Sequence, residues 1–306
     1  MFDQETGHAV HARIAGDIDD LPPPPWRLIG EGLWGEVHDL GDGTVLKLIR
    51  RHAGLGTGTS KLAREAAALK LAGGLAIGGL RIPNYRGHGH WDNPFAFGGS
   101  YNGPPLAGWI RMERMEGRAR AEMTFYGRMA EEGSRFGEEL GAAIAAFHRE
   151  TGACVPEAAK LGDSLMRSLE EALSRISSAE QRRRLDILRA RWGASGGAPV
   201  FVHGDLNLSN VLGGPGGLAF VDFAEAGIGA PETDLRHFEN TGPLRDAIFR
   251  GYAAVAGRMP DLERYRMAVA VDAAVSLAIG GDSGHPREGL RRRQWLEEAL
   301  RQAGID

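Results

Sequence analysis

Two short apolar runs, 201–212 and 218–223, flank a stretch of glycine and proline, and among their polar residues are Asp205, Asn210 and Asp222. Apolar runs on either side of such a turn predict a hairpin of short strands. Asp205 and Asn210 fall in the loop before the first strand, and Asp222 ends the second. Two carboxylates and a carboxamide that converge across a hairpin suit a hard cation such as Mg²⁺, which prefers oxygen ligands.

The order of these residues is that of a kinase catalytic loop followed by a metal-binding aspartate. The pattern His-Gly-Asp-x-x-x-x-Asn stands here as His203, Gly204, Asp205 and Asn210. By accident it would arise in roughly one such chain in several hundred. The chain resembles the aminoglycoside phosphotransferase and choline kinase-like family, which has a protein kinase-like fold. The resemblance implies that Asp205 orients the acceptor hydroxyl and accepts its proton, and that Asn210 and Asp222 bind Mg²⁺.

A second glycine-rich pattern lies near the N-terminus, between two predicted strands. Residues 30–37 read Gly-x-Gly-x-x-Gly-x-Val, and Lys47 lies on the next predicted strand. A Rossmann motif needs a helix after the glycines, whereas a strand follows here. Strand, glycines, strand and lysine strand are the kinase order. The resemblance implies that the backbone of Gly30, Gly32 and Gly35 approaches the phosphates of ATP and that Lys47 contacts them.

The same region predicts a buried ion pair. Lys47 alternates with Val45 and Ile49, which places it on an apolar strand face, and Glu65 lies at the edge of the apolar stripe of a predicted helix, 60–72. An ammonium group on an apolar face needs a counter-charge. Glu65 is the predicted partner, as in kinases. The alternatives are a lysine that reaches water at a sheet edge and a solvated helix acid.

The fold class we expect is α+β, with two lobes as in protein kinases. Residues 1–25 would form an N-terminal arm or a short edge strand, 26–115 a β-rich nucleotide-binding lobe, and 116–306 a mainly helical lobe with the catalytic loop. The resemblance also implies a hinge between the lobes, where the carbonyl of Glu113 and the amide of Met115 hold the adenine edge.

Composition and charge exclude several classes of protein. The net charge of −4 and a pI near 6.2 argue against a general nucleic-acid binder, and the basic runs 182–184 and 291–293 are interpreted as solvated helix faces. A single cysteine, Cys154, excludes an intrachain disulfide. The longest apolar stretch, 267–279, is interrupted by Asp272 and too short to span a bilayer. We expect a cytoplasmic protein without a membrane or nucleic-acid partner, and the oligomeric state is not predicted.

The segment after Asp222 bears on the acceptor. Only eleven residues, 223–233, separate it from Asp234, too few for the activation segment of a protein kinase. The motif Gly-x-Pro-x-x-Asp-Leu at 229–235 resembles the small-molecule family instead. We therefore expect ATP-dependent transfer of the γ-phosphoryl group to a hydroxyl of a small molecule, bound between the catalytic loop and the helices of 117–199. A protein or peptide kinase and a silent nucleotide-binding module are the alternatives.

Two positions depart from the family pattern. Asn207 stands where histidine is frequent and Ala230 where an acid is frequent. Because neither is a metal or base position, we expect them to affect the substrate rather than activity. His148, at the end of a predicted helix, is expected to be structural. Glu225, Glu232 and Glu239 are interpreted as surface charge, with a place at the acceptor site as the alternative.

Overall fold

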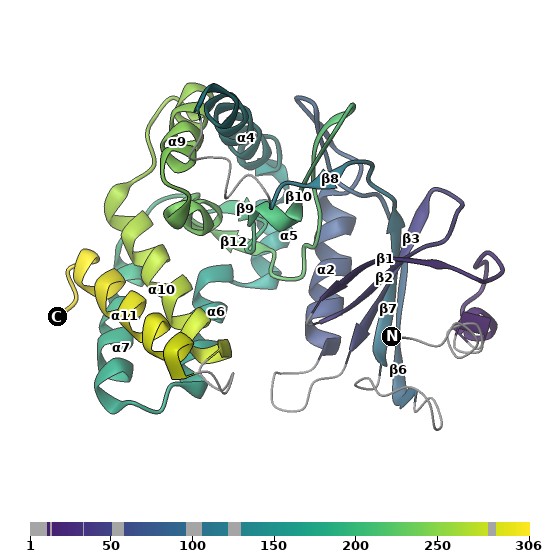
Figure 1. Ribbon diagram of the computed structural model, residues 1–306, viewed down its shortest axis with the longest axis horizontal. Coiled ribbons are helices and arrows are strands. Elements are labelled where there is room, and N and C mark those ends of the chain that lie inside the picture. Colours follow the sequence, from purple (N-terminus) through teal and green to yellow (C-terminus); the bar gives the residue numbers. More distant parts are fainter. Residues whose placement is uncertain are drawn as a thin grey trace. The chain divides into compact units, whose positions relative to one another are not determined.

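Two units make up the computed structural model of the chain, and each is described by itself (Figure 1). Unit 1 comprises residues 1–75 and 82–116, and unit 2 comprises 76–81 and 117–306. The structure describes residues 11–12, 14–32, 34–50, 58–95, 106–121, 130–280 and 286–306. The first ten residues of the expected arm and Leu33 of the glycine-rich pattern lie outside these ranges.

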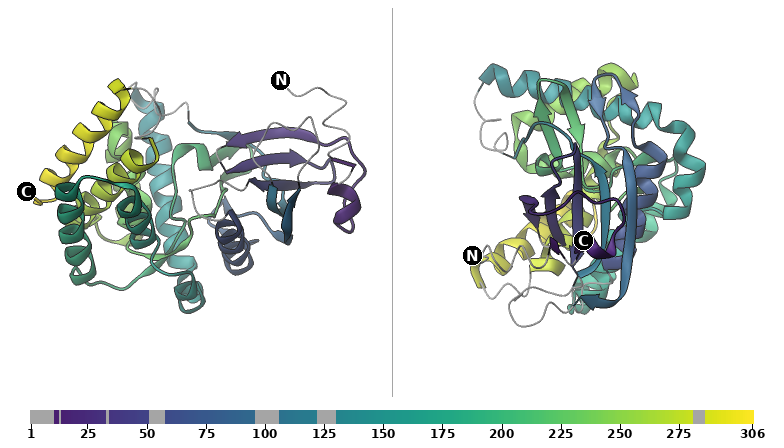
Figure 2. Two further views of the ribbon diagram at one scale, coloured as in Figure 1. Left: turned by 90° about the horizontal axis from the view of Figure 1, so that it is seen from below. Right: turned by 90° about the vertical axis from the view of Figure 1, so that its right-hand side faces the viewer.

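Unit 1 is built on an antiparallel sheet with the strand order β1-β2-β3-β7-β6. The central strand, β3, is buried over its middle five residues because both faces of the sheet are covered. Helix α2 covers one of them (Figures 1 and 2). The elements are β1 (Arg27–Gly32), β2 (Gly35–Asp39), β3 (Thr44–Arg50), α2 (Gly58–Ala72), β6 (Tyr85–Phe95) and β7 (Leu106–Glu113).

The N-terminal segment covers the other face of this sheet. Residues 11–17 are helical where described, and Ile14 and Ile18 join Trp26, Leu46 and Leu48 in one apolar cluster. Residues four apart share a helix face, so the two isoleucines reach the sheet together. We expected an arm or an edge strand here; from residue 11 onward the segment is instead part of the core of unit 1.

Unit 2 contains a second sheet, with the strand order β4-β5-β11-β10-β8. Strands β10 and β11 are the predicted hairpin, in which Val211 pairs with Phe220 and Gly214 with Gly217. A separate pair, β9 with β12, frames the catalytic loop. The strands are β4 (Ala76–Ile77), β5 (Leu80–Arg81), β8 (Arg118–Ala119), β9 (Val200–Val202), β10 (Val211–Gly214), β11 (Gly217–Phe220) and β12 (Gly227–Gly229).

Helices form the rest of unit 2. Helix α10 is lined with small apolar residues, is buried over most of its length, and packs against α6 and α11 (Figure 1). None of the helices in the described residues is long and apolar enough to cross a membrane. The helices are α4 (Ala130–Glu150), α5 (Val155–Ala158), α6 (Ser164–Arg175), α7 (Ala179–Ala194), α8 (Glu232–Leu235), α9 (Pro243–Ala256), α10 (Leu262–Gly280) and α11 (Pro286–Gln302).

Candidate active site

A buried ion pair joins the sheet and the helix of unit 1. Nζ of Lys47 on β3 donates to Oε2 of Glu65 on α2 at 2.8 Å. Lys47 is 7% exposed and Glu65 1%. Leu46 and Leu48 enter the apolar cluster on one face of β3, so strand alternation directs Lys47 to the α2 face. The predicted contact is therefore present, and the edge-lysine and solvated-acid alternatives are wrong.

The three glycines of the N-terminal pattern stand in different surroundings. Gly30 pairs with Val37, and Gly32 pairs with Gly35 next to the turn of the β1–β2 hairpin. A Cβ atom on Gly35 would lie 2.1 Å from the carbonyl oxygen of Leu48, whereas one on Gly32 would meet nothing within 4 Å. Gly35 is thus required for the packing of β2 on β3, and Gly32 leaves its side of the backbone open to a ligand.

The predicted hinge residues lie at the end of β7 and directly after it. The Glu113 carboxylate accepts from the side-chain amide of Asn84 at 2.6 Å, and the Glu113 backbone N–H donates to the Asn84 carbonyl at 2.9 Å. These contacts fix the end of the strand. The Met115 amide has no acceptor among the described residues.

The catalytic loop of unit 2 folds around Asp205. The Asn210 side-chain amide donates to the Asp205 carbonyl at 2.8 Å and to its Oδ2 at 3.3 Å. With its nitrogen turned inward, Asn210 keeps its amide oxygen for another partner. The Asp205 side chain is 41% exposed, so a substrate can reach it.

Asp222 follows β11 in a left-handed conformation, with φ of 67°. Aspartate and asparagine are the side chains that adopt this region most readily. The N–H of the preceding residue, Val221, donates to the Asn210 carbonyl at 3.0 Å, which places the two predicted metal ligands on adjoining backbone segments. Within the described ranges no group of three or more His, Cys, Asp or Glu residues is arranged to hold a metal. One carboxylate and one amide fit Mg²⁺, whose other ligands are commonly phosphate oxygens and water.

His203 ties the catalytic loop to the segment that carries Asp222. Its Nε2–H donates to the Val221 carbonyl at 2.9 Å, and its Nδ1 accepts from the Asp205 N–H at 3.3 Å. Complete burial, with Phe223 at 4.4 Å between ring centroids, lowers the pKa of His203. The neutral ring satisfies both contacts, so His203 positions the loop and does not take up a proton.

Asp234 stabilises the loop that carries Asp205. Its buried carboxylate accepts hydrogen bonds from the backbone N–H of His203 (3.0 Å), from that of Gly204 (2.8 Å) and from Nε2 of His148 (2.9 Å). Burial would raise the pKa of Asp234, but these donors, His148 first, bring it below its ordinary value. Tyr252, kept protonated by a pKa that burial raises, lies with its hydroxyl 3.3 Å from Nδ1 of His148. His148 is structural, as predicted.

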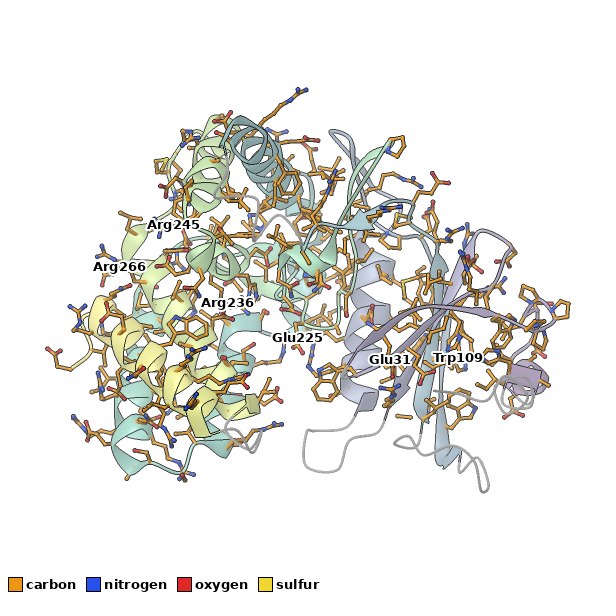
Figure 3. The ribbon with its side chains drawn as sticks, viewed as in Figure 1. Glu31, Trp109, Glu225, Arg236, Arg245 and Arg266 are labelled. Carbon is orange, nitrogen blue, oxygen red and sulfur yellow. The ribbon has the colours of Figure 1, made fainter. Side chains whose placement is uncertain are left out.

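Arg236 stabilises the same loop through the carbonyl group of Gly204. The guanidinium of Arg236, which is labelled in Figure 3, donates to the Gly204 carbonyl at 2.7 Å and to the Thr233 carbonyl. Gly204 has φ of 85°, and a Cβ atom there would lie 2.1 Å from the Glu225 carbonyl oxygen. Only glycine fits this position, which explains the second residue of the His-Gly-Asp motif.

His237 lies between Asp205, the predicted catalytic residue, and a second carboxylate. Its Nε2 is 3.5 Å from Oδ1 of Asp205, and its Nδ1 is 3.3 Å from Oδ1 of Asp272 on α10. Burial raises the pKa of Asp272. The charge and the hydrogen bond of His237, and then those of Arg236, outweigh this effect, so the pKa of Asp272 lies below its ordinary value. The motifs in the sequence gave no sign of His237 or of Asp272.

The structure corrects two of our expectations. Asn207 donates its side-chain amide to Oδ1 of Asp205 at 3.2 Å, so this departure from the family pattern contacts the predicted base directly. Glu232 is only 3% exposed and accepts from the Asp261 N–H at 2.8 Å, so it is not a surface charge. The Glu239 carboxylate accepts hydrogen bonds from the guanidinium of Arg245, which is labelled in Figure 3, and from the Tyr265 hydroxyl.

Comparison with known proteins adds independent evidence. The sequence model of a family described as "Phosphotransferase enzyme family" matches residues 36–268. No curated protein sequence matches the chain. Among solved structures, an aminoglycoside phosphotransferase with GDP and kanamycin is 19% identical, with a TM-score of 0.67 over 95% of this chain and 98% of that one. The macrolide 2'-phosphotransferase of Brachybacterium faecium is 18% identical, with a TM-score of 0.59 over 95% and 98%.

A choline/ethanolamine kinase family protein from Mesorhizobium loti is 14% identical, with a TM-score of 0.59 over 99% of each chain. At these identities the likenesses establish the fold, which is α+β and protein kinase-like, as predicted.

Proposed function

The chain belongs to the phosphotransferase enzyme family, and we propose that it moves the γ-phosphoryl group of ATP to a hydroxyl group of a small molecule. One observation carries this proposal: the accessible Asp205 carboxylate is held by Asn210, a predicted metal ligand, in a loop fixed by buried groups. Phosphoryl transfer needs chiefly positioning and charge neutralisation. The catalytic loop is built for positioning.

The nucleotide would be held by unit 1. Lys47, kept in place by Glu65, would contact the α- and β-phosphates. The open side of Gly32 is where backbone can approach the phosphates. The Met115 amide, which has no acceptor among the described residues, would donate to the adenine edge.

Asn210 and Asp222 would bind Mg²⁺, and the metal would neutralise charge on the phosphates as the γ-phosphoryl group is transferred. Asp222 supplies the only full negative charge of the two. Asn210 has a second task, since its amide nitrogen holds the Asp205 backbone.

Asp205 would accept the proton of the acceptor hydroxyl while that oxygen bonds to the γ-phosphorus and the bond to the β-phosphate oxygen breaks. The products are ADP and a phosphate monoester. Asn207 donates to one oxygen of Asp205 and Asn210 to the other, so the carboxylate presents a fixed face. This arrangement favours proton acceptance from one direction.

The solved relatives are named for different acceptors: aminoglycosides, macrolides, and choline or ethanolamine. We propose only what these have in common, an accessible hydroxyl group on a small molecule. Some of these structures are GDP complexes, so the donor needs its own test.

The test is nucleoside diphosphate release with ATP or GTP, across a broad panel of small hydroxyl compounds, with Mg²⁺ and with EDTA. We expect acceptor-dependent release with ATP and Mg²⁺, none with EDTA, and none from Asp205→Ala. Release that is unchanged in Asp205→Ala would contradict the proposal, as would phosphorylation of peptides alone.

A further inference from the structure

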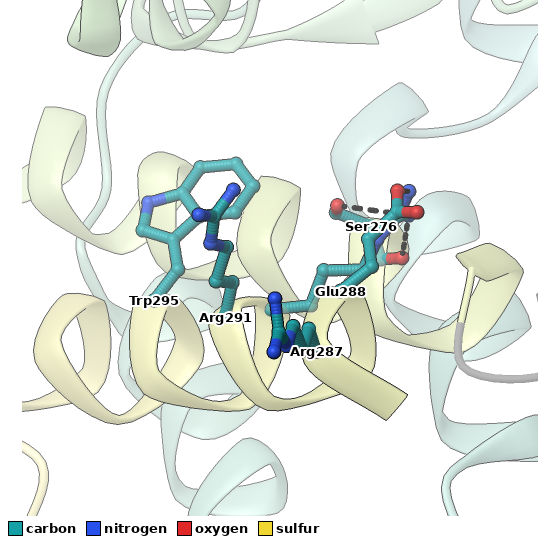
Figure 4. Close-up of a pocket in the computed structure, with 6 residues that line it drawn as sticks. Ser276, Arg287, Glu288, Arg291 and Trp295 are labelled. Carbon is teal, nitrogen blue, oxygen red and sulfur yellow. Dashed lines mark hydrogen bonds and ion pairs between the residues drawn. The ribbon is translucent and has the colours of Figure 1, made fainter. Parts of the chain in front are cut away.

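A pocket lies between α10 and α11 in unit 2, apart from the loop that carries Asp205 (Figure 4). It is a hollow of about 660 Å³ that is largely open to solvent, and the side chains of Arg287 and Arg291 in its lining are exposed. Arg287, Arg291 and Trp295 succeed one another at intervals of four along α11, so they share one face of that helix. The lining is completed by Ser276, Glu288 and Arg292.

Charge in this pocket is unbalanced. Arg292 is tied down by the Ser276 carbonyl at 2.7 Å and by an ion pair with Glu288, which uses the one acid of the lining. Arg287 and Arg291 have no ion-pair partner among the described residues. A cation in the first turn of a helix is also unfavourable for the helix dipole, so helix stability does not account for Arg287.

The pocket is linked to the base by a short path within unit 2. His237 bridges Asp205 and Asp272, and Asp272 lies on α10 one turn before Ser276. Four residues of helix span about 6 Å, so the pocket begins within roughly 15 Å of the Asp205 carboxylate. A single molecule that binds both would have to span this distance over the surface of unit 2, about the length of a disaccharide or a nucleotide.

We propose that the acceptor of this enzyme carries an oxyanion, a carboxylate or a phosphate, that binds Arg287 and Arg291 while its hydroxyl lies at Asp205. This inference rests on the proposed function. Guanidinium groups bind both oxyanions through paired hydrogen bonds. Trp295 adds an aromatic surface for the apolar part of the ligand. A polycationic acceptor would meet two uncompensated positive charges here.

The test uses hydroxy acids and sugar phosphates, each compared with its uncharged alcohol and its amino alcohol. Binding is measured by ligand-observed NMR on the whole protein with a non-hydrolysable ATP analogue, and turnover by ADP release. Anionic members should have Kd and KM values at least tenfold below those of their neutral analogues. Comparison of the hydroxy acids with the sugar phosphates also decides whether the oxyanion is a carboxylate or a phosphate.

The variant is Arg291→Glu, and the matched control is Arg293→Glu, which makes the same charge change at an exposed position of the same helix outside the pocket. Arg291→Glu should weaken binding of the anionic members by about tenfold to hundredfold, which is the loss of one charge-assisted pair, and leave the KM for ATP unchanged. Arg293→Glu should behave as the wild type.

Preference for neutral or cationic compounds, absence of binding by every anionic member, or wild-type binding by Arg291→Glu would overturn the inference. If anionic compounds bind through Arg291 but no compound is phosphorylated, the pocket is assigned correctly and the proposed function is wrong.

Discussion

Replacement of Lys47, of Glu65 or of both should change the free energy of unfolding and the turnover in different ways. Because Lys47 and Glu65 are almost fully buried, Glu65→Leu leaves an ammonium group without its counter-charge inside unit 1. Such a loss costs about 3–5 kcal/mol, a large part of the 5–15 kcal/mol that stabilises a typical domain. Lys47→Met should cost a similar amount, since it removes the charge that balances a buried carboxylate.

The double variant Lys47→Met/Glu65→Leu should be far more stable than the sum of the single effects. Replacing a buried ion pair by apolar side chains of similar volume is often neutral or stabilising. Its free energy of unfolding should lie within about 2 kcal/mol of the wild type, a coupling well beyond the range for independent sites. Turnover should stay as low as in Lys47→Met, because the phosphate contact is still missing.

Urea unfolding and ADP release on the four proteins measure both quantities. The control is Arg27→Met, since Arg27 pairs with Asp39 at 2.9 Å while its side chain is 69% exposed, and the loss should be within about 1 kcal/mol. Additive stability effects of Lys47→Met and Glu65→Leu would refute the buried pair. Recovery of turnover in the double variant would refute the role of Lys47.

Four further outcomes follow from the site. Asp205→Ala should lower kcat by orders of magnitude with nearly unchanged ATP affinity, measured by steady-state kinetics and nucleotide titration. Asp222→Asn, which the left-handed backbone tolerates, should weaken Mg²⁺-dependent ATP binding more than Asn210→Ala does, by calorimetry. His237→Gln should lower kcat about tenfold at constant KM for ATP, because Asp205 loses a neighbour that orients it. Since the folded pKa of Asp234 is lowered, its contribution to stability is complete above about pH 4 and is lost as pH falls through the folded pKa; urea midpoints of Asp234→Asn should show less acid dependence than the wild type.

Features that depend on neighbours in sequence could be predicted from it. Apolar runs on either side of glycines gave the β10–β11 hairpin, with Asp205 and Asn210 before it and Asp222 after it. Strand alternation and helix periodicity gave the Lys47–Glu65 contact, since each places a side chain on one face of a regular element. The periodicity of the strand or helix fixes the direction in which a side chain points. A charged side chain that points into the core then requires a partner of opposite charge.

The supports of the loop could not be found in this way, because they join residues far apart in the chain. His148 and Asp234 are 86 positions apart, and Asp234 reaches back 30 positions to the Gly204 N–H. The sequence marks Asp234 as part of the motif 229–235 and His148 as the end of a helix, but neither segment indicates the other as its partner. Asn207 was missed for another reason: it is close to Asp205 in sequence, but only the backbone turn between them directs its amide at the carboxylate.

The basic run at 291–293 shows why adjacent charges cannot be interpreted as one patch. Successive residues of a helix point about 100° apart, so three neighbouring arginines have three different surroundings. Arg291 lines the pocket, Arg292 is fixed by Ser276 and Glu288, and Arg293 is exposed. By exposure, the interpretation as a solvated face holds for Arg291 as well as for Arg293, whereas Arg292 is half-buried. What distinguishes Arg291 is the presence of α10 beside it, and a packed neighbour of that kind is invisible to the periodicity of α11.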